Sequence, residues 1–277
     1  METALLNEPR TYRYSTVRVV LLIIMLLLLG IAPFMILGST DSLYILLTWM
    51  FIGVVMLVSV YSLTRSTTVS NDGISTRSLL GERSLNWGEI NSASGSGNKI
   101  KLHNRDGDVS VAPSPHLPGY PEVIEMIGAK RPDLFNPAEY TVMSRNWLSS
   151  LWFLVIGVLF IGVGIYLYFD ASGTETLIPI IFLAVIGLTF IGAILMSVLS
   201  LRLDGSSLTI RYLLGQTVLK PEEVKSVGLN VTQTRNGKSY NILMFTDRGR
   251  TIRFSGIGPS LPIVYLVLRN WQQGRVK

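Results

Sequence analysis

Four long apolar runs divide the polar remainder of this chain of 277 residues. They cover residues 19–38, 43–63, 147–169 and 177–201, and none of them contains a charged side chain. Because roughly 20 apolar residues, each rising about 1.5 Å, cross the hydrocarbon core of a bilayer, every run is long enough for a transmembrane helix. A short polar break inside each pair of runs predicts that its two helices return antiparallel, as a membrane hairpin.

After each pair of runs, the pattern changes to short alternating segments separated by turns. Asn-Asp-Gly at positions 71–73 lies between two such segments, which is typical of a β-hairpin. Pro121 and the apolar residues after it predict a helix that closes the first segment. Ser260 is placed to cap a helix that runs to Gln273 and closes the second. We therefore predict two small antiparallel β domains, each with a C-terminal helix.

The two halves of the chain have matching motifs. RSLLG at 77–81 corresponds to RYLLG at 211–215, and one offset, 134 residues, separates Arg77 from Arg211 and Glu89 from Glu223. We expect both glutamates to cap or pair locally, and Trp87 to pack against the sheet. The leucines of the two motifs are expected to be core residues; they are Leu79, Leu80, Leu213 and Leu214.

With these motifs, the chain resembles a duplicated member of the membrane-anchored bacterial pleckstrin-homology-like family. The resemblance rests on NDGISTRSLLGERSLNWGEI, on DGSSLTIRYLLGQTVLKPEEV, and on the apolar pair before each. It implies an α+β membrane protein with four transmembrane helices in two hairpins and two small PH-like domains, each an antiparallel β-barrel or sandwich with a C-terminal helix. The implied divisions are a cytoplasmic N-terminal segment (1–16), transmembrane hairpin 1 (17–64), PH-like domain 1 (65–136), a linker (137–146), transmembrane hairpin 2 (147–201) and PH-like domain 2 (202–277).

The distribution of charge predicts the topology. All 24 Lys and Arg residues lie outside the apolar runs and outside the two short breaks, which carry only Asp41, Asp170 and Glu175. This positive-inside asymmetry predicts a multi-pass protein of the bacterial cytoplasmic (inner) membrane with both termini in the cytoplasm. It also accounts for the net charge of +6 without nucleic acid as a partner. The expected membrane-interface anchors are Arg13, Arg18, Arg65, Arg145, Trp147 and Arg202.

The apolar runs themselves suggest packing and not transport. Thr189, Ala193 and Ser197 repeat at intervals of four residues, a small-residue pattern that lets helices approach closely. They are a possible helix-packing face, either inside the bundle or toward a partner. No ionisable residue lies in any run, whereas ion-coupled transporters and pumps normally need such groups near the bilayer midplane.

No catalytic or cofactor site is expected. The chain has no cysteine and only two histidines, His103 and His116, which have no visible partners for a metal or acid–base cluster. No nucleotide-binding loop or nucleophile motif is present. We therefore expect a non-enzymatic protein with no cofactor, no metal and no small-molecule substrate.

Two functions remain open at this stage. The first is an integral membrane scaffold or accessory subunit that presents two cytoplasmic domains to protein partners or to other copies of itself. The alternative is a sensor of anionic lipid headgroups that uses basic strand faces. The basic residues concerned form either a solvated face or a surface for an acidic partner or headgroup; they are Lys99, Lys101 and Arg105 in the first copy, and Lys238, Arg248, Arg250 and Arg253 in the second.

Overall fold

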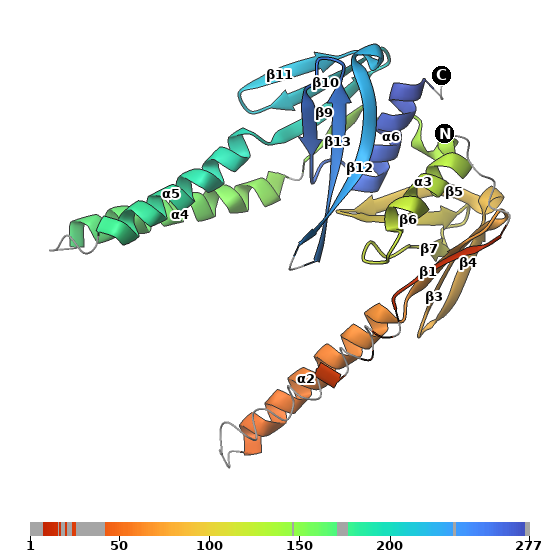
Figure 1. The fold of residues 1–277 in the computed structure, drawn as a ribbon, viewed down its shortest axis with the longest axis horizontal. Coiled ribbons are helices and arrows are strands. Elements are labelled where there is room, and N and C mark those ends of the chain that lie inside the picture. Colours follow the sequence, from red (N-terminus) through yellow and green to blue (C-terminus); the bar gives the residue numbers. More distant parts are fainter. Residues whose placement is uncertain are drawn as a thin grey trace. The chain divides into compact units, whose positions relative to one another are not determined.

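The chain divides into two compact units, which are described separately (Figure 1). Unit 1 comprises residues 1–94 and 99–131, and unit 2 comprises residues 95–98 and 132–277. A computed structural model is the basis of the description. It describes residues 8–15, 17, 20, 24–25, 42–145, 147–170, 177–234 and 237–274.

Unit 1 has two antiparallel sheets and two described helices, α2 (Ser42–Leu63) and α3 (Tyr120–Lys130). One sheet has the strand order β1-β2-β3-β4 and the other β5-β6-β7. The 3-10 turn η1 (Trp87–Glu89) separates them in the chain. The strands are β1 (Arg10–Arg13), β2 (Ser66–Val69), β3 (Gly73–Ser78), β4 (Gly81–Asn86), β5 (Ile90–Ser96), β6 (Lys99–Asn104) and β7 (Ser110–Val111).

Local sequence explains the elements of unit 1. In the β2–β3 turn, the Ser70 N–H donates to the Gly73 carbonyl over 2.9 Å. A Cβ at Gly73 would lie 2.3 Å from the Leu85 carbonyl oxygen, so only glycine fits there. The apolar stripe of α3, which includes Val123 and Ile127, is fully buried. Trp87 is 8 % exposed and donates its indole N–H to the Ser70 carbonyl, which confirms that it packs against the sheet.

Unit 2 repeats the two-sheet arrangement, with helices α4 (Trp147–Asp170), α5 (Leu177–Leu195) and α6 (Leu261–Gln273). One sheet has the order β11-β10-β9-β8 and the other β12-β13-β14. The 3-10 turns η2 (Pro132–Phe135) and η4 (Pro221–Glu223) complete the unit. The strands are β8 (Val142–Ser144), β9 (Val198–Asp204), β10 (Ser207–Tyr212), β11 (Gly215–Leu219), β12 (Val224–Thr234), β13 (Gly237–Thr246) and β14 (Thr251–Phe254).

Helix α6 forms the centre of the unit 2 core. It packs against η2, β12 and β13, and nearly all of its side chains are buried. Asn270, only 3 % exposed, donates its side-chain N–H groups to the carbonyls of Pro132 (3.2 Å) and Phe135 (3.1 Å). A buried amide that is bonded in this way ties η2 to the helix and does not leave polar groups without partners.

The helices α4 and α5 are inserted between two neighbouring strands of one sheet. Strand β8 leads into α4 and strand β9 follows α5, yet the two strands pair directly, with Ser144 opposite Ser200. Beyond that pair, the Arg145 N–H donates to the Leu199 carbonyl over 2.8 Å. The chain therefore enters α4 and leaves α5 at the same end of the four-stranded sheet (Figure 1).

The two helices are packed closely at a pair of glycines. A Cβ at Gly187 would lie 2.7 Å from the Gly157 carbonyl oxygen, and a Cβ at Gly157 would lie 3.1 Å from the Gly187 carbonyl oxygen. Phe190 of α5 stacks on Phe153 and Phe160 of α4, with ring centroids 5.8 and 6.2 Å apart. Small residues at the closest approach of two helices let their backbones come near each other.

The predicted fold class, four transmembrane helices plus two PH-like domains, is wrong. The described residues contain five α-helices, of which two are long and apolar enough to cross a membrane, with spans Leu151–Phe169 and Ile178–Leu195. The apolar stretch of α2 among the described residues, Trp49–Tyr61, is shorter than a span. The strands form four separate antiparallel sheets, because η1 and η4 interrupt the pairing between successive sheets. Most of the run at 19–38, with Arg18 and Asp41, lies outside the described residues.

The prediction that the leucines of the two Leu-Leu motifs are core residues is also wrong. Leu79 is 62 % exposed and Leu80 85 % exposed, in the turn between β3 and β4. Leu213 (53 %) and Leu214 (81 %) occupy the turn between β10 and β11. The side chains at the tip of a two-residue hairpin project beyond both strands, so neither sheet covers them.

Candidate functional site

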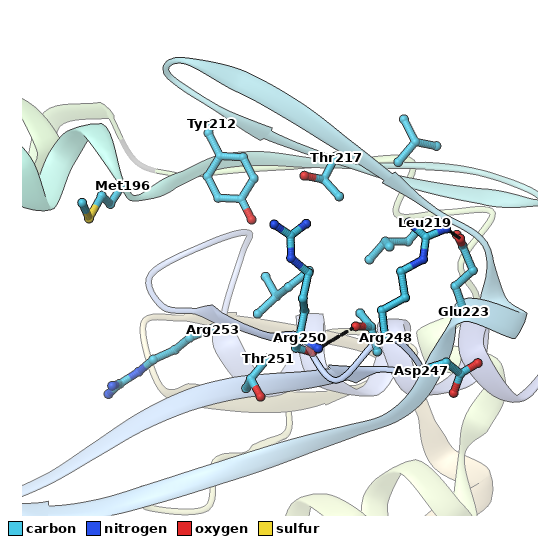
Figure 2. A pocket seen from close by; sticks show the side chains of 13 residues that line it. Met196, Tyr212, Thr217, Leu219, Glu223, Asp247, Arg248, Arg250, Thr251 and Arg253 are labelled. Carbon is cyan, nitrogen blue, oxygen red and sulfur yellow. Dashed lines mark hydrogen bonds and ion pairs between the residues drawn. The ribbon is translucent and has the colours of Figure 1, made fainter.

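A pocket of about 880 Å³ opens in unit 2 between its two sheets (Figure 2). The β10–β11 hairpin forms one wall, with Tyr212, Thr217 and Leu219. The turn between β13 and β14 and the start of β14 form the other wall. This second wall carries three arginines, Arg248, Arg250 and Arg253.

A tight turn holds the arginine wall in place. The Thr246 N–H donates to the Arg250 carbonyl over 2.9 Å, and the Thr246 hydroxyl bonds the same residue through its carbonyl (3.1 Å) and its N–H (3.2 Å). Gly249 has φ +74°, a left-handed conformation that favours glycine. These contacts set the direction in which the side chains before and after Gly249 leave the turn.

Arg250 points into the pocket. Figure 2 shows its guanidinium directed toward the hydroxyl of Tyr212 and toward Thr217, whereas Asp247 directs its carboxylate away. Burial raises the pKa of the Tyr212 hydroxyl, and the Arg250 charge opposes that shift. Arg250 forms no ion pair with any residue in the described part of the chain. Its cationic head is therefore available to an anion that enters the pocket.

Arg248 is engaged differently. Its guanidinium lies 3.2 Å from a carboxylate oxygen of Glu223, although its side chain remains 81 % exposed. The other Glu223 oxygen accepts the Lys220 N–H over 3.0 Å and caps η4. Glu89 accepts the Asn86 N–H over 3.0 Å at the matching place in unit 1. These bonds confirm that both glutamates cap or pair locally.

The pocket lies where the apolar helices leave the unit. Met196, the residue directly after the span Ile178–Leu195, lines it. Tyr212 pairs with Val198 at the start of β9, so the pocket wall is at the same end of the sheet as the end of α5. Any bilayer crossed by α5 would begin next to this opening.

Unit 1 has a smaller basic pocket, of about 280 Å³, between its own two sheets. It is lined by Arg65, Arg77, Arg83 and Lys101, with Glu82 as the acidic residue. Like the pocket of unit 2, it adjoins a Leu-Leu hairpin and the end of an apolar helix.

The predicted basic surfaces are brought together only in part. Arg248 and Arg250 share the unit 2 pocket, and Arg253 lines it but extends away from Arg250 in Figure 2. Lys238 lies at the far end of β13, paired with Gln233.

The three basic residues predicted in the first copy are also separated. Lys99 and Lys101 lie exposed on the same face of β6, and Lys101 lines the unit 1 pocket. Arg105 lines a different cavity, beyond the end of β6, with Glu89 and Asp106.

The predicted interface anchors do not all lie at the ends of the apolar helices. Arg65 directly follows the described turn at the end of α2, stacks on the Tyr61 ring at 4.6 Å and donates to its hydroxyl over 2.7 Å. Arg13 ends β1 opposite Ser66, and Arg145 adjoins the start of α4. Trp147 begins α4, but its side chain, like Arg18, is outside what the structure describes. Arg202 is well inside β9, because α5 ends at Leu195 and not at residue 201.

The nearest atoms at Gly157 and Gly187 belong to residues outside the small-residue face predicted on α5. Thr189 and Ala193 are exposed, and the Thr189 hydroxyl donates to the Val185 carbonyl over 2.7 Å. Ser197 lies beyond the helix end, where its hydroxyl donates to the Ile194 carbonyl. A role for this face toward a partner helix stays a prediction.

The opposing wall of the unit 2 pocket was missed from the sequence. Tyr212 and Thr217 belong to a hairpin whose approach to the β13–β14 turn is a tertiary feature, and no local pattern marks them. Among the described residues, no group of three or more His, Asp or Glu side chains is placed to hold a metal ion. Comparison with known protein families and with curated proteins finds no match to this sequence.

Proposed function

We propose that this protein is a membrane-anchored, non-catalytic binder of anionic lipid headgroups, with the unit 2 pocket as its binding site. The observation that carries the proposal is Arg250, which points into an open pocket beside the end of an apolar span and has no ion-pair partner among the described residues. A phosphate or carboxylate of a headgroup accepts the several N–H donors of a guanidinium in a planar arrangement.

The membrane part of the proposal concerns α4 and α5. Both helices are long and apolar enough to cross a membrane. We propose that they cross the bacterial inner membrane as a hairpin and that unit 2 lies on the cytoplasmic side. Arg145 flanks the helices on the side of unit 2, whereas Asp170 ends α4 at the opposite end. This charge asymmetry supports a cytoplasmic unit 2 and a cytoplasmic C-terminus, and the same reasoning extends to the N-terminus.

The scaffold function, which we ranked first from the sequence, stays a prediction. It rests on general features, namely apolar helices without ionisable residues and small domains without a catalytic motif. The headgroup function has the more specific support of a pocket, a directed arginine and a position at the end of a span. A matching basic pocket in unit 1 adds to that support.

The test measures binding of short-chain lipids to the full-length protein in a neutral detergent. The probes are dihexanoyl phosphatidic acid and dihexanoyl phosphatidylcholine, below their micellar concentrations. We expect the anionic lipid to bind more tightly than the zwitterionic one. Since a hydrogen bond to a charged group contributes about 1.5–3 kcal/mol, Arg250→Gln should weaken binding of the anionic lipid by at least roughly tenfold.

Arg211→Gln is the matched control. Arg211 precedes Tyr212 on the same strand but is exposed and does not line the pocket, because successive side chains of a strand face opposite ways. This variant should bind the anionic lipid as the unmodified protein does. Equal weakening by the two variants, or equal binding of the two lipids, would refute a specific pocket. Protein partners that co-purify with a chain that binds neither lipid would favour the scaffold function.

A further inference from the structure

Exposed leucine pairs occur at the same place in both units. Each occupies the two-residue turn of a β-hairpin, where glycine, asparagine and aspartate are the usual residues. Leu80 is 85 % exposed and Leu214 is 81 % exposed. Exposed leucines at a hairpin tip lower the solubility of a protein and do not stabilise its core. Such apolar surface is typical of a site that contacts another protein or a membrane.

Strand register puts Leu213 and Leu214 at the membrane end of unit 2. Tyr212, the residue before the pair, is opposite Val198, three residues after the end of α5 at Leu195. The turn therefore extends past the sheet in the direction of the helix end. Figure 1 shows the tip of the β10–β11 hairpin at the end of the sheet where α5 arrives.

The anchoring of the helices keeps this tip at the bilayer surface. Strand β8 leads into α4 and strand β9 follows α5, and the two strands are hydrogen-bonded neighbours. The start of α4 and the end of α5 are therefore attached to the same end of one sheet. If α4 and α5 cross a bilayer, this end of the sheet faces the headgroups. Met196, between α5 and β9, is 83 % exposed and adds to the apolar surface there.

The arrangement in unit 1 is the same. Arg77 of β3 is opposite Ser66, which follows the end of α2 at Leu63, and Leu79 and Leu80 come just beyond. The Ser78 hydroxyl accepts the Leu80 N–H over 3.3 Å and so satisfies the backbone of the turn while both leucines project outward. Arg83, on the other strand of the hairpin, lines the basic pocket beside this tip.

From these observations we infer that Leu213 and Leu214 insert into the lipid bilayer beside the α4–α5 hairpin. The inference rests on the proposed membrane crossing but not on the headgroup pocket. Its physical basis is that the transfer of an aliphatic side chain from water to the boundary of the acyl chains lowers the free energy.

The test uses single cysteines, which are unambiguous because the chain has none of its own. Full-length Leu214→Cys and Leu213→Cys carry an environment-sensitive fluorophore, in nanodiscs whose lipids bear a nitroxide near the top of the acyl chain. We expect a blue-shifted emission and a loss of fluorescence to the nitroxide at both sites. Leu159→Cys, in the middle of α4 and 59 % exposed, should be quenched as a positive control, with a deeper nitroxide. Ser206→Cys, at the other end of β10, should not be quenched.

The outcomes separate the two proposals. Quenching at Leu159→Cys without quenching at Leu214→Cys and Leu213→Cys would overturn the insertion of the unit 2 leucines and leave the headgroup pocket untouched. No quenching at Leu159→Cys would overturn the membrane crossing and with it the insertion. A blue shift without quenching would mean that protein covers the leucines, which also overturns it. Insertion should persist in purely zwitterionic nanodiscs and in the Arg250→Gln background, whereas headgroup binding should not.

Discussion

The glycine contact between α4 and α5 offers a sharp test of how the hairpin is built. A methyl group added at Gly187 would lie 2.7 Å from the Gly157 carbonyl oxygen and 2.6 Å from a side-chain carbon of Ile161. The isoleucine can rotate, but the backbone carbonyl cannot move without the helix, so Gly187→Ala must push the helices apart. Overpacking of this kind typically costs about 1–3 kcal/mol.

Gly192→Ala is the matched control on the same helix. A Cβ at Gly192 would meet no atom within 4 Å. Replacing a mid-helix glycine with alanine at an open position is expected to be neutral or to stabilise by up to about 1 kcal/mol. The two variants therefore differ in sign, although the chemical change is identical.

The assay is unfolding of the full-length protein by SDS in mixed micelles, followed by tryptophan fluorescence. Gly187→Ala should lower the SDS fraction at the midpoint, and Gly192→Ala should leave it unchanged or raise it. Equal midpoints for the two variants would refute the close packing of α4 on α5 at these glycines.

Two further predictions concern α6 and the strand β6. Asn270→Ala removes the donors to the buried Phe135 carbonyl and the part-buried Pro132 carbonyl, so it should lower the free energy of unfolding by about 1–3 kcal/mol. Gln273→Ala, exposed in the same helix, should change it little, and thermal unfolding in detergent compares the two variants. Burial and the charge of Lys101 lower the pKa of His103 below 6.5, so the unfolded chain binds protons more readily there. Stability should therefore fall as the pH drops through 6.5 toward the lower pKa of the folded chain, and His103→Gln should remove this part of the pH dependence; an unchanged slope in that variant would contradict it.

Local signals predicted much of the secondary structure. The Asn-Asp-Gly turn correctly predicted the pairing of β2 and β3. Ser260 correctly marked the start of the helix α6, observed at Leu261–Gln273, but the predicted cap is wrong, since the Ser260 hydroxyl makes no capping hydrogen bond. Turn chemistry and apolar periodicity are properties of a few adjacent residues, so a sequence is sufficient to read them.

The same local signals do not predict which strands pair when they are far apart in the sequence. The strands β1 and β8 are very short, and we assigned their residues to an N-terminal segment and a linker. Each pairs with a strand on the far side of an apolar stretch, as with Arg13 and Ser66. The end of α5 was misplaced for a related reason, since β9 begins with apolar residues that continue the run without a break.

The candidate site was predicted from one side only. Arg248, Arg250 and Arg253 were recognised as a basic group, but the partner wall at Tyr212 depends on how two sheets meet. The exposed leucines were misread because an apolar residue in a strand motif normally faces a core. The apolar tip of the β10–β11 hairpin, beside the end of α5, breaks that rule, and only the strand register reveals its position.

Labelling of single cysteines on the two sides of the membrane tests the proposed crossing of α4 and α5 most directly. Single cysteines Asp170→Cys, at the end of α4, and Ser206→Cys, in the β9–β10 turn, are exposed to a membrane-impermeant thiol reagent in intact bacterial cells. If unit 2 is cytoplasmic, Asp170→Cys is labelled at once and Ser206→Cys is labelled only after the membrane is made permeable. Labelling of Ser206→Cys in intact cells, or equal labelling of the two sites before and after permeabilisation, would contradict it.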